Sequence, residues 1–255
     1  MKYMIAAQTD IGNTRPANED SVCIKRGNIG GVPVVLAAVC DGMGGLEKGG
    51  LASATVVKTL NRWYLEKLPQ LAVGPDWDGI NRSIKDLAVK LNSQIFKFGE
   101  DTQQRLGTTL CAMIIIGNAY EIINIGDSRA YIILNNGARQ LTKDQTFVQR
   151  EIDMGNLTVE QAKRHPKRNM LLQCIGASAQ TVPETSFGSI RSGESYLLCT
   201  DGFRHYISND ELARTFGGEI PASEDSIKEK IEDVITLVKQ RGEKDNITAV
   251  VIRAV

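Results

Sequence analysis

The sequence predicts an α+β fold in which antiparallel sheets are covered by helices. Segments rich in β-branched residues follow one another through turns as short as Gly117-Asn118 and 135–137. Connections this short join antiparallel strands, because parallel neighbours need a crossover of roughly a dozen residues or more. Helical patterns cluster between these meanders and do not alternate with single strands. This arrangement argues against a doubly wound parallel sheet.

Eight segments have the composition of strands, being short, β-branched and bounded by turn residues. They are residues 3–8, 22–26, 34–40, 108–116, 120–125, 130–134, 196–199 and 247–252. The apolar segment at the N-terminus is too short for a signal peptide, so we interpret it as the first strand. The tight turns between neighbouring segments predict strand meanders.

Three segments repeat apolar residues at helical spacing, so each is predicted to pack one face on a sheet. The first carries Ala52, Val56, Leu60 and Trp63, the second Ile80, Ile84, Leu87, Leu91, Ile95 and Phe98, and the third Ile227, Ile231, Val234, Ile235 and Val238. Loops are predicted at 71–78 and at 217–224. A chain of 255 residues without internal repeats is interpreted as one domain, 1–255.

The composition, with 42% hydrophobic and 24% charged residues, is typical of a folded protein. Basic and acidic residues both number 30, so no overall basic field favours nucleic acid or an anionic membrane surface. The apolar runs, such as 34–40 and 111–116, are far shorter than the roughly 18 residues of a membrane span. Five dispersed cysteines without a CxxC pair predict buried free thiols in a reducing cytoplasm, and no zinc site.

Four aspartates stand at the ends of predicted strands. Asp41, Asp127 and Asp201 follow strands, and Asp245 precedes the last one. Each of them taken alone is explained as a turn residue, since Asp-Gly is a common turn dipeptide. Four together favour a shared role, because an ionised carboxylate beside a buried strand needs a positive partner.

These strand-end carboxylates predict a metal site if they converge in space. Carboxylates a few ångströms apart take up protons unless a divalent metal neutralises them. Oxygen ligands without a histidine or cysteine cluster select Mg²⁺ or Mn²⁺ over Zn²⁺. The glycine at Gly42 would let its carbonyl turn toward the ion. Arg15, close in sequence to Glu19 and Asp20, is either a surface ion-pair partner or, beside such a cluster, a fork of donors for phosphate oxygens.

Nine motifs resemble the PPM (type 2C) metal-dependent protein serine/threonine phosphatases of the bacterial type. They run in order along nearly the whole chain: GNTRPANED (12–20), DGMGG (41–45), GTT (107–109), GDSRAY (126–131), LTKDQ (141–145), HPKRN (165–169), LLQCIGA (171–177), LLCTDGF (197–203) and DNITAVVI (245–252). No single motif is decisive; their joint order and spacing carry the resemblance.

The resemblance implies a four-layer α/β/β/α sandwich of two antiparallel sheets, flanked by helices, with a metal cleft at one end. Two ions, Mn²⁺ or Mg²⁺, would lie in this cleft. Asp41 would bridge them, with the Gly42 carbonyl and Glu19 completing one shell. Asp201 and Asp245 would bind the other ion.

Three further roles come from the same resemblance. Asp20 would hold water ligands of the second metal, and Arg15 would clamp the substrate phosphate. Asp127, with Asp201, matches the position where bacterial relatives hold a third, weaker metal. The implied activity is hydrolysis of phosphoserine and phosphothreonine in proteins by metal-activated water. We expect a cytoplasmic protein, a monomer, that opposes a bacterial serine/threonine kinase.

Two residues depart from the family pattern. Met43 stands where animal relatives commonly have histidine, a candidate proton donor, and a thioether cannot donate a proton. Either a metal-bound water donates, or His165 reaches in; a surface histidine at a helix end is the favoured interpretation of His165. Gln145 stands where the family often has histidine, and we interpret it as a surface variation.

Residues 146–169 correspond to the family's mobile flap, a segment beside the cleft. Four basic residues gather in this flap: Lys163, Arg164, Lys167 and Arg168. They would either meet a phosphopeptide or form a solvated helix face, and charge runs are usually the latter.

Two other functions stay open on the sequence. The first is an inactive relative that binds phosphoproteins without turnover, which the presence of Asp41, Asp201 and Asp245 disfavours. The second is a hydrolase of small phosphate esters. No sequence feature argues against it, because a family does not by itself settle the substrate.

Overall fold

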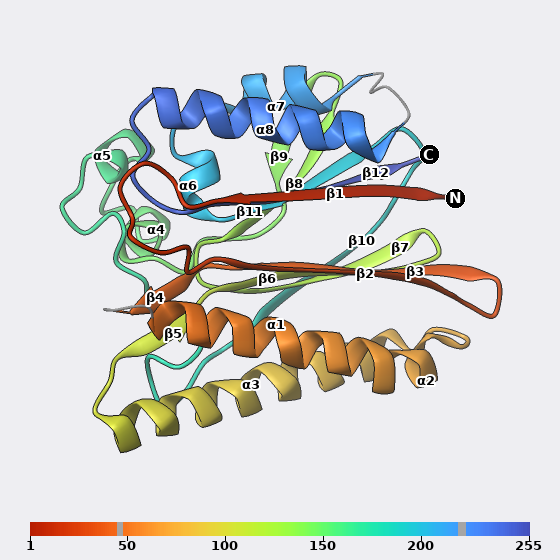
Figure 1. Cartoon of the computed structure of the whole chain (residues 1–255), viewed down its shortest axis with the longest axis horizontal. Helices are drawn as coiled ribbons and strands as arrows, with labels where there is room; N and C mark the ends of the chain where they lie inside the picture. The colour runs from red at the N-terminus through yellow and green to blue at the C-terminus, as the bar shows by residue number, and fades with distance from the viewer. Residues whose placement is uncertain (45–47, 219–222) are drawn as a thin grey trace.

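The computed structural model describes residues 1–44, 48–218 and 223–255. Two five-stranded antiparallel sheets stack face to face, and helices cover the outer face of each sheet (Figure 1). This four-layer α/β/β/α arrangement confirms the predicted fold class. Gly45 of the DGMGG motif and residues 219–222 of the predicted 217–224 loop lie outside the described residues.

Sheet A contains both chain ends. Its strands are, in order, β1 (Tyr3–Asp10), β12 (Ile247–Ala254), β11 (Ser195–Cys199), β8 (Arg129–Leu134) and β9 (Gly137–Gln140). β1 pairs with β12 along its whole length. Beyond this ladder, Lys2 and Val255 exchange both of their backbone hydrogen bonds, each 2.9 Å long. The two chain ends therefore lie side by side (Figure 1).

Sheet B is built from β10 (Glu184–Ser189), β7 (Ala119–Ile125), β6 (Leu110–Ile116), β3 (Val32–Cys40) and β2 (Ser21–Ile29). A separate ribbon pairs β4 (Gly42–Gly44) with β5 (Leu106–Thr108). The prediction of one strand over 108–116 is therefore wrong, because the strand is interrupted at Thr109, between β5 and β6. At this break the amide of Thr109 donates to the carbonyl oxygen of Asp41 over 2.9 Å, in place of a ladder partner.

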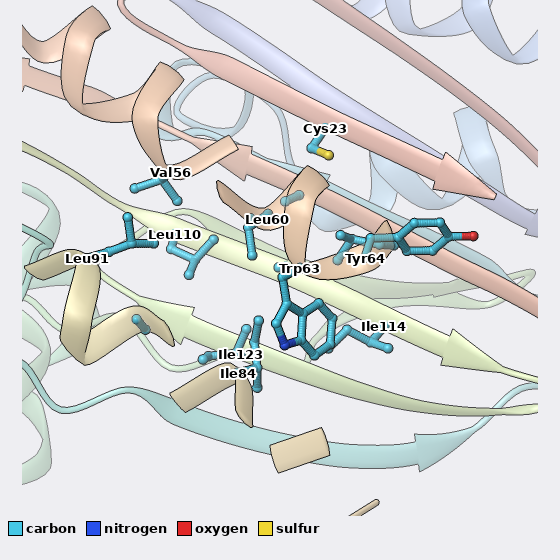
Figure 2. Close-up of a cluster of buried hydrophobic side chains, with 14 of the residues drawn as sticks. Cys23, Val56, Leu60, Trp63, Tyr64, Ile84, Leu91, Leu110, Ile114 and Ile123 are labelled. Atoms are coloured by element: carbon cyan, nitrogen blue, oxygen red, sulfur yellow. The ribbon is translucent and has the colours of Figure 1, made fainter. Parts of the chain in front are cut away.

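Helices α1 (Lys48–Glu66), α2 (Leu68–Ala72) and α3 (Trp77–Thr102) cover sheet B. Figure 2 shows Leu60 and Trp63 of α1 and Ile84 of α3 facing Ile123 of the sheet. Burying one such side chain stabilises the fold by about 1.5–3 kcal/mol. The predicted loop 71–78 is shorter in the structure, because α2 ends at Ala72 and the Asp76 side chain caps α3 by accepting from the amide of Gly79. Phe98, placed in the apolar stripe by its spacing, is 43% exposed.

Helices α6 (Asp201–Arg204), α7 (Asn209–Phe216) and α8 (Glu224–Gln240) lie on sheet A. Phe203, Phe216 and Ile231 are fully or almost fully buried against this sheet. A third core fills the space between the two sheets, with Met113 from sheet B and Val250 from sheet A. Within the described residues, no helix is both long enough and apolar enough to cross a lipid bilayer.

Candidate metal-binding active site

The strand-end aspartates gather at one edge of the stacked sheets. In sheet B, Ser21 pairs with Cys40, so the start of β2 lies beside the end of β3. In sheet A, Cys199 pairs with Ala249, so the end of β11 lies beside the start of β12. This edge is opposite the chain ends, and α6 lies next to it together with α4 (Phe147–Asp153) and α5 (Val159–Lys163) (Figure 1).

The carboxyl of Asp41 is within electrostatic reach of the other acids. Burial raises its pKa well above the ordinary value, and four neighbouring carboxylates raise this pKa further: Asp20, Asp201, Asp127 and Asp245. A carboxylate cluster of this kind retains protons at neutral pH unless a cation replaces them. Acids from five separate chain positions therefore share one site.

Two threonines of the GTT motif fix the backbone at Asp41. The amide of Asp41 donates to Thr109 Oγ1 over 2.9 Å, and the carbonyl of Asp41 accepts from Thr108 Oγ1 over 2.9 Å. Thr109 Oγ1 also lies 2.6 Å from Ser128 Oγ, next to Asp127 in the chain. The GTT and GDS motifs thus join two of the acidic turns through buried hydroxyl groups.

Thr200, the residue before Asp201, connects Asp20 to the turn that carries Asp201. Thr200 Oγ1 donates to Asp20 Oδ2 over 2.9 Å, and burial raises the pKa of Asp20 to about 7. Asp201 Oδ1 is buried and has no hydrogen-bond partner within the described part of the chain. A buried carboxylate oxygen without a partner is costly. Asp201 therefore has the free oxygen that a metal ligand requires.

Two glycines let the backbone pass close to the acids. A Cβ atom on Gly42 would lie 2.4 Å from the carbonyl oxygen of Glu19. A Cβ atom on Gly202 would lie 2.2 Å from the carbonyl oxygen of Asn246 and 3.5 Å from the Cβ of Asp245. A side chain cannot be accommodated at such distances, so packing requires glycine at both positions.

Asn246 is a buried residue that the sequence analysis missed. Its Oδ1 accepts from the amide of Glu19 over 2.9 Å. Its Nδ2 donates to the carbonyl oxygens of Ile11 and Ala17 over 2.9 and 3.0 Å. Asn246 therefore holds the loop that carries Arg15 and the first two acids against the start of β12. An asparagine directly before an apolar strand was the available signal, since a buried amide needs partners.

Arg15 lies beside two of the acids, Asp245 and Glu19, and forms an ion pair with the first. Its Nη2 donates to Asp245 Oδ2 over 2.6 Å, and its side chain is half exposed. The hydrogen bond to Asp245 raises the pKa of Arg15, and the charges of Asp41 and Glu19 raise this pKa as well. The guanidinium is thus held at the rim of the acidic cluster with part of its surface open.

Side chains of the cluster are engaged with protein partners. Among the described residues, no three acidic, histidine or cysteine side chains are arranged around one point as metal ligands. Asp245 is paired with Arg15, and Glu19 Oε1 accepts from the amide of Gly49 over 2.9 Å. The donor set still fits a hard divalent cation, because it offers carboxylates, dense negative charge and the unpartnered oxygen of Asp201.

His205 and Glu243 are further residues at the site that the sequence did not indicate. His205 Nε2 lies 3.5 Å from Asp201 Oδ2, and its Nδ1 lies 3.2 Å from Glu243 Oε2. The other oxygen of Glu243 accepts from the amide of Asp245 over 2.8 Å. His205 and Glu243 therefore connect the turn at Asp201 to the turn at Asp245. These residues are far apart in the sequence and come together only in the folded protein.

His165, considered as an alternative proton donor, and Gln145, a departure from the family pattern, both have structural partners. The ring of His165 stacks on Phe147 at 5.5 Å, and its Nδ1 accepts from the amide of Lys167 over 3.1 Å. Gln145 Oε1 accepts from the amide of Gly126 over 2.8 Å, at the turn before Asp127. The interpretation of Gln145 as a surface variation is therefore wrong, because this side chain supports an acidic turn of the site.

The family model for protein phosphatase 2C matches residues 17–246. This chain belongs to the protein phosphatase 2C family. It is 31% identical over 247 residues to the serine/threonine phosphatase stp of Listeria welshimeri, covering 96% of this chain and 93% of that protein. The predicted family is thus confirmed, and with it the class of enzyme, a metal-dependent phosphoprotein phosphatase.

Two solved structures extend this protein phosphatase 2C assignment to the fold. The serine/threonine phosphatase of S. agalactiae superposes with a TM-score of 0.87 at 29% identity, covering 100% of both chains. The catalytic domain of the phosphatase PstP, in complex with two manganese ions, superposes with a TM-score of 0.80 at 30% identity, covering 98% of this chain and 97% of that one.

Proposed function

We propose that this protein phosphatase 2C member hydrolyses phosphoserine and phosphothreonine in proteins at a binuclear Mn²⁺ or Mg²⁺ centre. The main support is the convergence of Asp41, Asp201 and Asp245, whose charges add to one another at one edge of the sheets. The relative from L. welshimeri is named a serine/threonine phosphatase, and the PstP structure contains two manganese ions. These names support the substrate class and the metal.

The acids would divide between two cations. Asp41 is the shared residue in this proposal, because the charges of the other aspartates converge on it. The remaining ligands would be the Gly42 carbonyl and Glu19 for one ion, and Asp201 and Asp245 for the other, with Asp20 behind the second ion. Glu19 and Asp245 must first leave their present partners, the amide of Gly49 and the guanidinium of Arg15.

When bound, the two cations supply an acidified water for in-line attack on phosphorus and neutralise charge on the phosphoryl oxygens. With Asp245 holding a cation, the fork of donors of Arg15 would be available to grip two phosphate oxygens. Met43 offers no proton for the leaving oxygen. The stacking of His165 on Phe147 supports a structural role for this histidine within the flap.

The proposal is tested with a phosphothreonine peptide, in Mn²⁺ and in excess chelator. Phosphate release should depend on metal, and Asp201→Asn should lower kcat by at least about 100-fold, since loss of a ligand exceeds loss of its supporting contacts. Asp233→Asn, an exposed aspartate on α8, is the matched control and should retain full activity. Release that continues in chelator, or a fully active Asp201→Asn variant, would refute the metal mechanism.

Two alternatives are separated by the same assay. A higher kcat/KM on small phosphate metabolites than on phosphopeptides would favour the small-ester hydrolase. Manganese binding without any phosphate release would favour the inactive relative.

We further propose that residues 1–255 form one domain, with the flap at 146–169, that acts as a cytoplasmic monomer on substrates of a bacterial serine/threonine kinase. The core shared between the two sheets supports the single domain.

A further inference from the structure

Arg204 is a cation built into the fold beside Asp127. It ends α6, and its side chain is 13% exposed. Its Nη2 donates to Asp127 Oδ2 over 3.3 Å and to the carbonyl oxygen of Asp127 over 3.4 Å. The same nitrogen lies 3.7 Å from Asp144 Oδ2. One guanidinium therefore faces two carboxylates that are themselves about nine-tenths buried.

Asp144 already has a cation of its own. Arg129 donates to both of its oxygens, over 2.7 and 2.6 Å, and Gln140 Nε2 donates to Oδ1 over 2.9 Å. Burial alone would raise the pKa of Asp144, but the hydrogen bonds and charge of Arg129, together with smaller contributions from the charge of Arg204 and the hydrogen bond of Gln140, outweigh burial and lower this pKa. Asp144 is thus ionised and satisfied by Arg129. The positive charge of Arg204 remains to balance Asp127.

A third metal ion does not fit this arrangement. Asp127 and Asp201 are the two acids that would hold it. Asp127 Oδ2 faces the guanidinium of Arg204, and Asp201 Oδ2 faces the imidazole of His205 at 3.5 Å. A divalent cation on Asp127 would lie within a few ångströms of a permanent positive charge, in a buried site where water screens poorly. The repulsion disfavours that ion.

We propose that Arg204 takes the place of a third metal in this chain. Its guanidinium neutralises Asp127, so Asp127 is not a metal ligand and the protein holds two divalent cations. This inference rests on the proposed two-metal centre and corrects the expectation, drawn from the family resemblance, of a third ion at Asp127. Arginine is suited to this role because it stays charged at any working pH.

The test is a count of bound Mn²⁺ at saturation, measured by equilibrium dialysis of the intact chain followed by elemental analysis. The wild-type protein should bind two ions. Arg204→Met, which keeps an unbranched side chain and removes its charge, should bind a third, weaker ion. The double variant Arg204→Met with Asp127→Asn should return to two ions. Arg214→Met, at an exposed arginine on α7, is the control and should bind two.

Asp127→Asn alone keeps the inference testable if Arg204→Met does not fold, which circular dichroism would reveal. It should still bind two ions. Three ions in the wild type, two in a folded Arg204→Met variant, or loss of an ion in Asp127→Asn would each overturn the inference while the two-metal centre stands. A wild-type protein that binds no Mn²⁺ would instead refute the proposed function on which the inference rests.

Discussion

The guanidinium of Arg15 and the carboxylate of Asp245 form an ion pair, with Nη2 and Oδ2 2.6 Å apart. In the proposed mechanism these groups have other partners, a phosphate for Arg15 and a metal for Asp245. A metal on Asp245 would therefore compete with this ion pair. Because the Arg15 side chain is half exposed, the pair contributes at most about 1 kcal/mol to stability.

Arg15→Met should separate these two roles. Mn²⁺ should bind about 2- to 5-fold more tightly, because Asp245 no longer has a competing partner. At the same time kcat/KM for a phosphopeptide should fall by roughly 10-fold or more, because charge-assisted bonds to phosphate are lost. Calorimetric titration with Mn²⁺ and steady-state kinetics measure the two effects, with Arg214→Met as control. Weaker Mn²⁺ binding by Arg15→Met would contradict the competition between guanidinium and metal.

Asn246→Ala should loosen the loop that carries Glu19. Three hydrogen bonds of a buried side chain are lost, so the free energy of unfolding should fall by about 2–3 kcal/mol. The affinity for Mn²⁺ should fall as well, since this loop supplies ligands. Urea denaturation and metal titration are the measurements, and Asn136→Ala, in an exposed turn, is the control. If Asn246→Ala unfolds at the urea concentration of the wild type, the bracing role assigned to Asn246 is wrong.

The raised pKa of Glu121 predicts a pH dependence of stability that does not involve the active site. Its Oε1 accepts from Asn81 Nδ2 over 2.5 Å, and burial raises its pKa from 4.5 to about 7. Between these values the folded state keeps a proton that the unfolded state has lost. The contribution of Glu121 to stability therefore falls as pH rises from about 4.5 to about 7.

Glu121→Gln should remove this fall. Between pH 4.5 and pH 8 the free energy of unfolding of the variant should rise by on the order of 2 kcal/mol relative to that of the wild type, because glutamine has no proton to lose. Urea unfolding across this pH range, with chelator present, measures the difference. Glu229→Gln, at an exposed position of α8, should follow the wild-type curve. Parallel curves for Glu121→Gln and wild type would show that Glu121 does not titrate in this window.

His165→Ala should leave kcat on phosphoserine within about twofold of wild type, because the ring is engaged with Phe147 and the amide of Lys167. The informative comparison is with an aryl phosphate, whose leaving group needs no general acid. A selective loss on phosphoserine would identify His165 as the proton donor and overturn this expectation.

The strands of both sheets were predictable where apolar, β-branched residues run between turns, as in β3 and β12. β10 was missed because ETSFGS, an edge strand, has no apolar run. The bounds of α4, α5 and α7 were also missed, because each helix is too short for a helical period to show. The capping boxes at Ser208 with Glu211 and at Thr158 with Gln161 were readable signals for two of them.

The acids of the candidate site could be predicted because each one abuts a strand that the sequence shows clearly. Asn246, His205 and Arg204 could not be predicted in the same way. Their partners are supplied by segments distant in the chain: Glu19 for Asn246, Glu243 for His205 and Asp127 for Arg204. A pattern within one segment does not reveal such pairs, which depend on how sheet A and sheet B are stacked.

The exchange of backbone hydrogen bonds between Lys2 and Val255 also bears on protein engineering. Adjacent ends allow circular permutation, in which a short glycine-rich linker joins the old termini and new ones are opened elsewhere. Residues 73–76, between α2 and α3, are a suitable place for the new opening, since Val73 is 71% exposed. The linker would lie at the edge of sheet A farthest from the acids, so a reporter inserted there would leave access for a phosphopeptide unchanged.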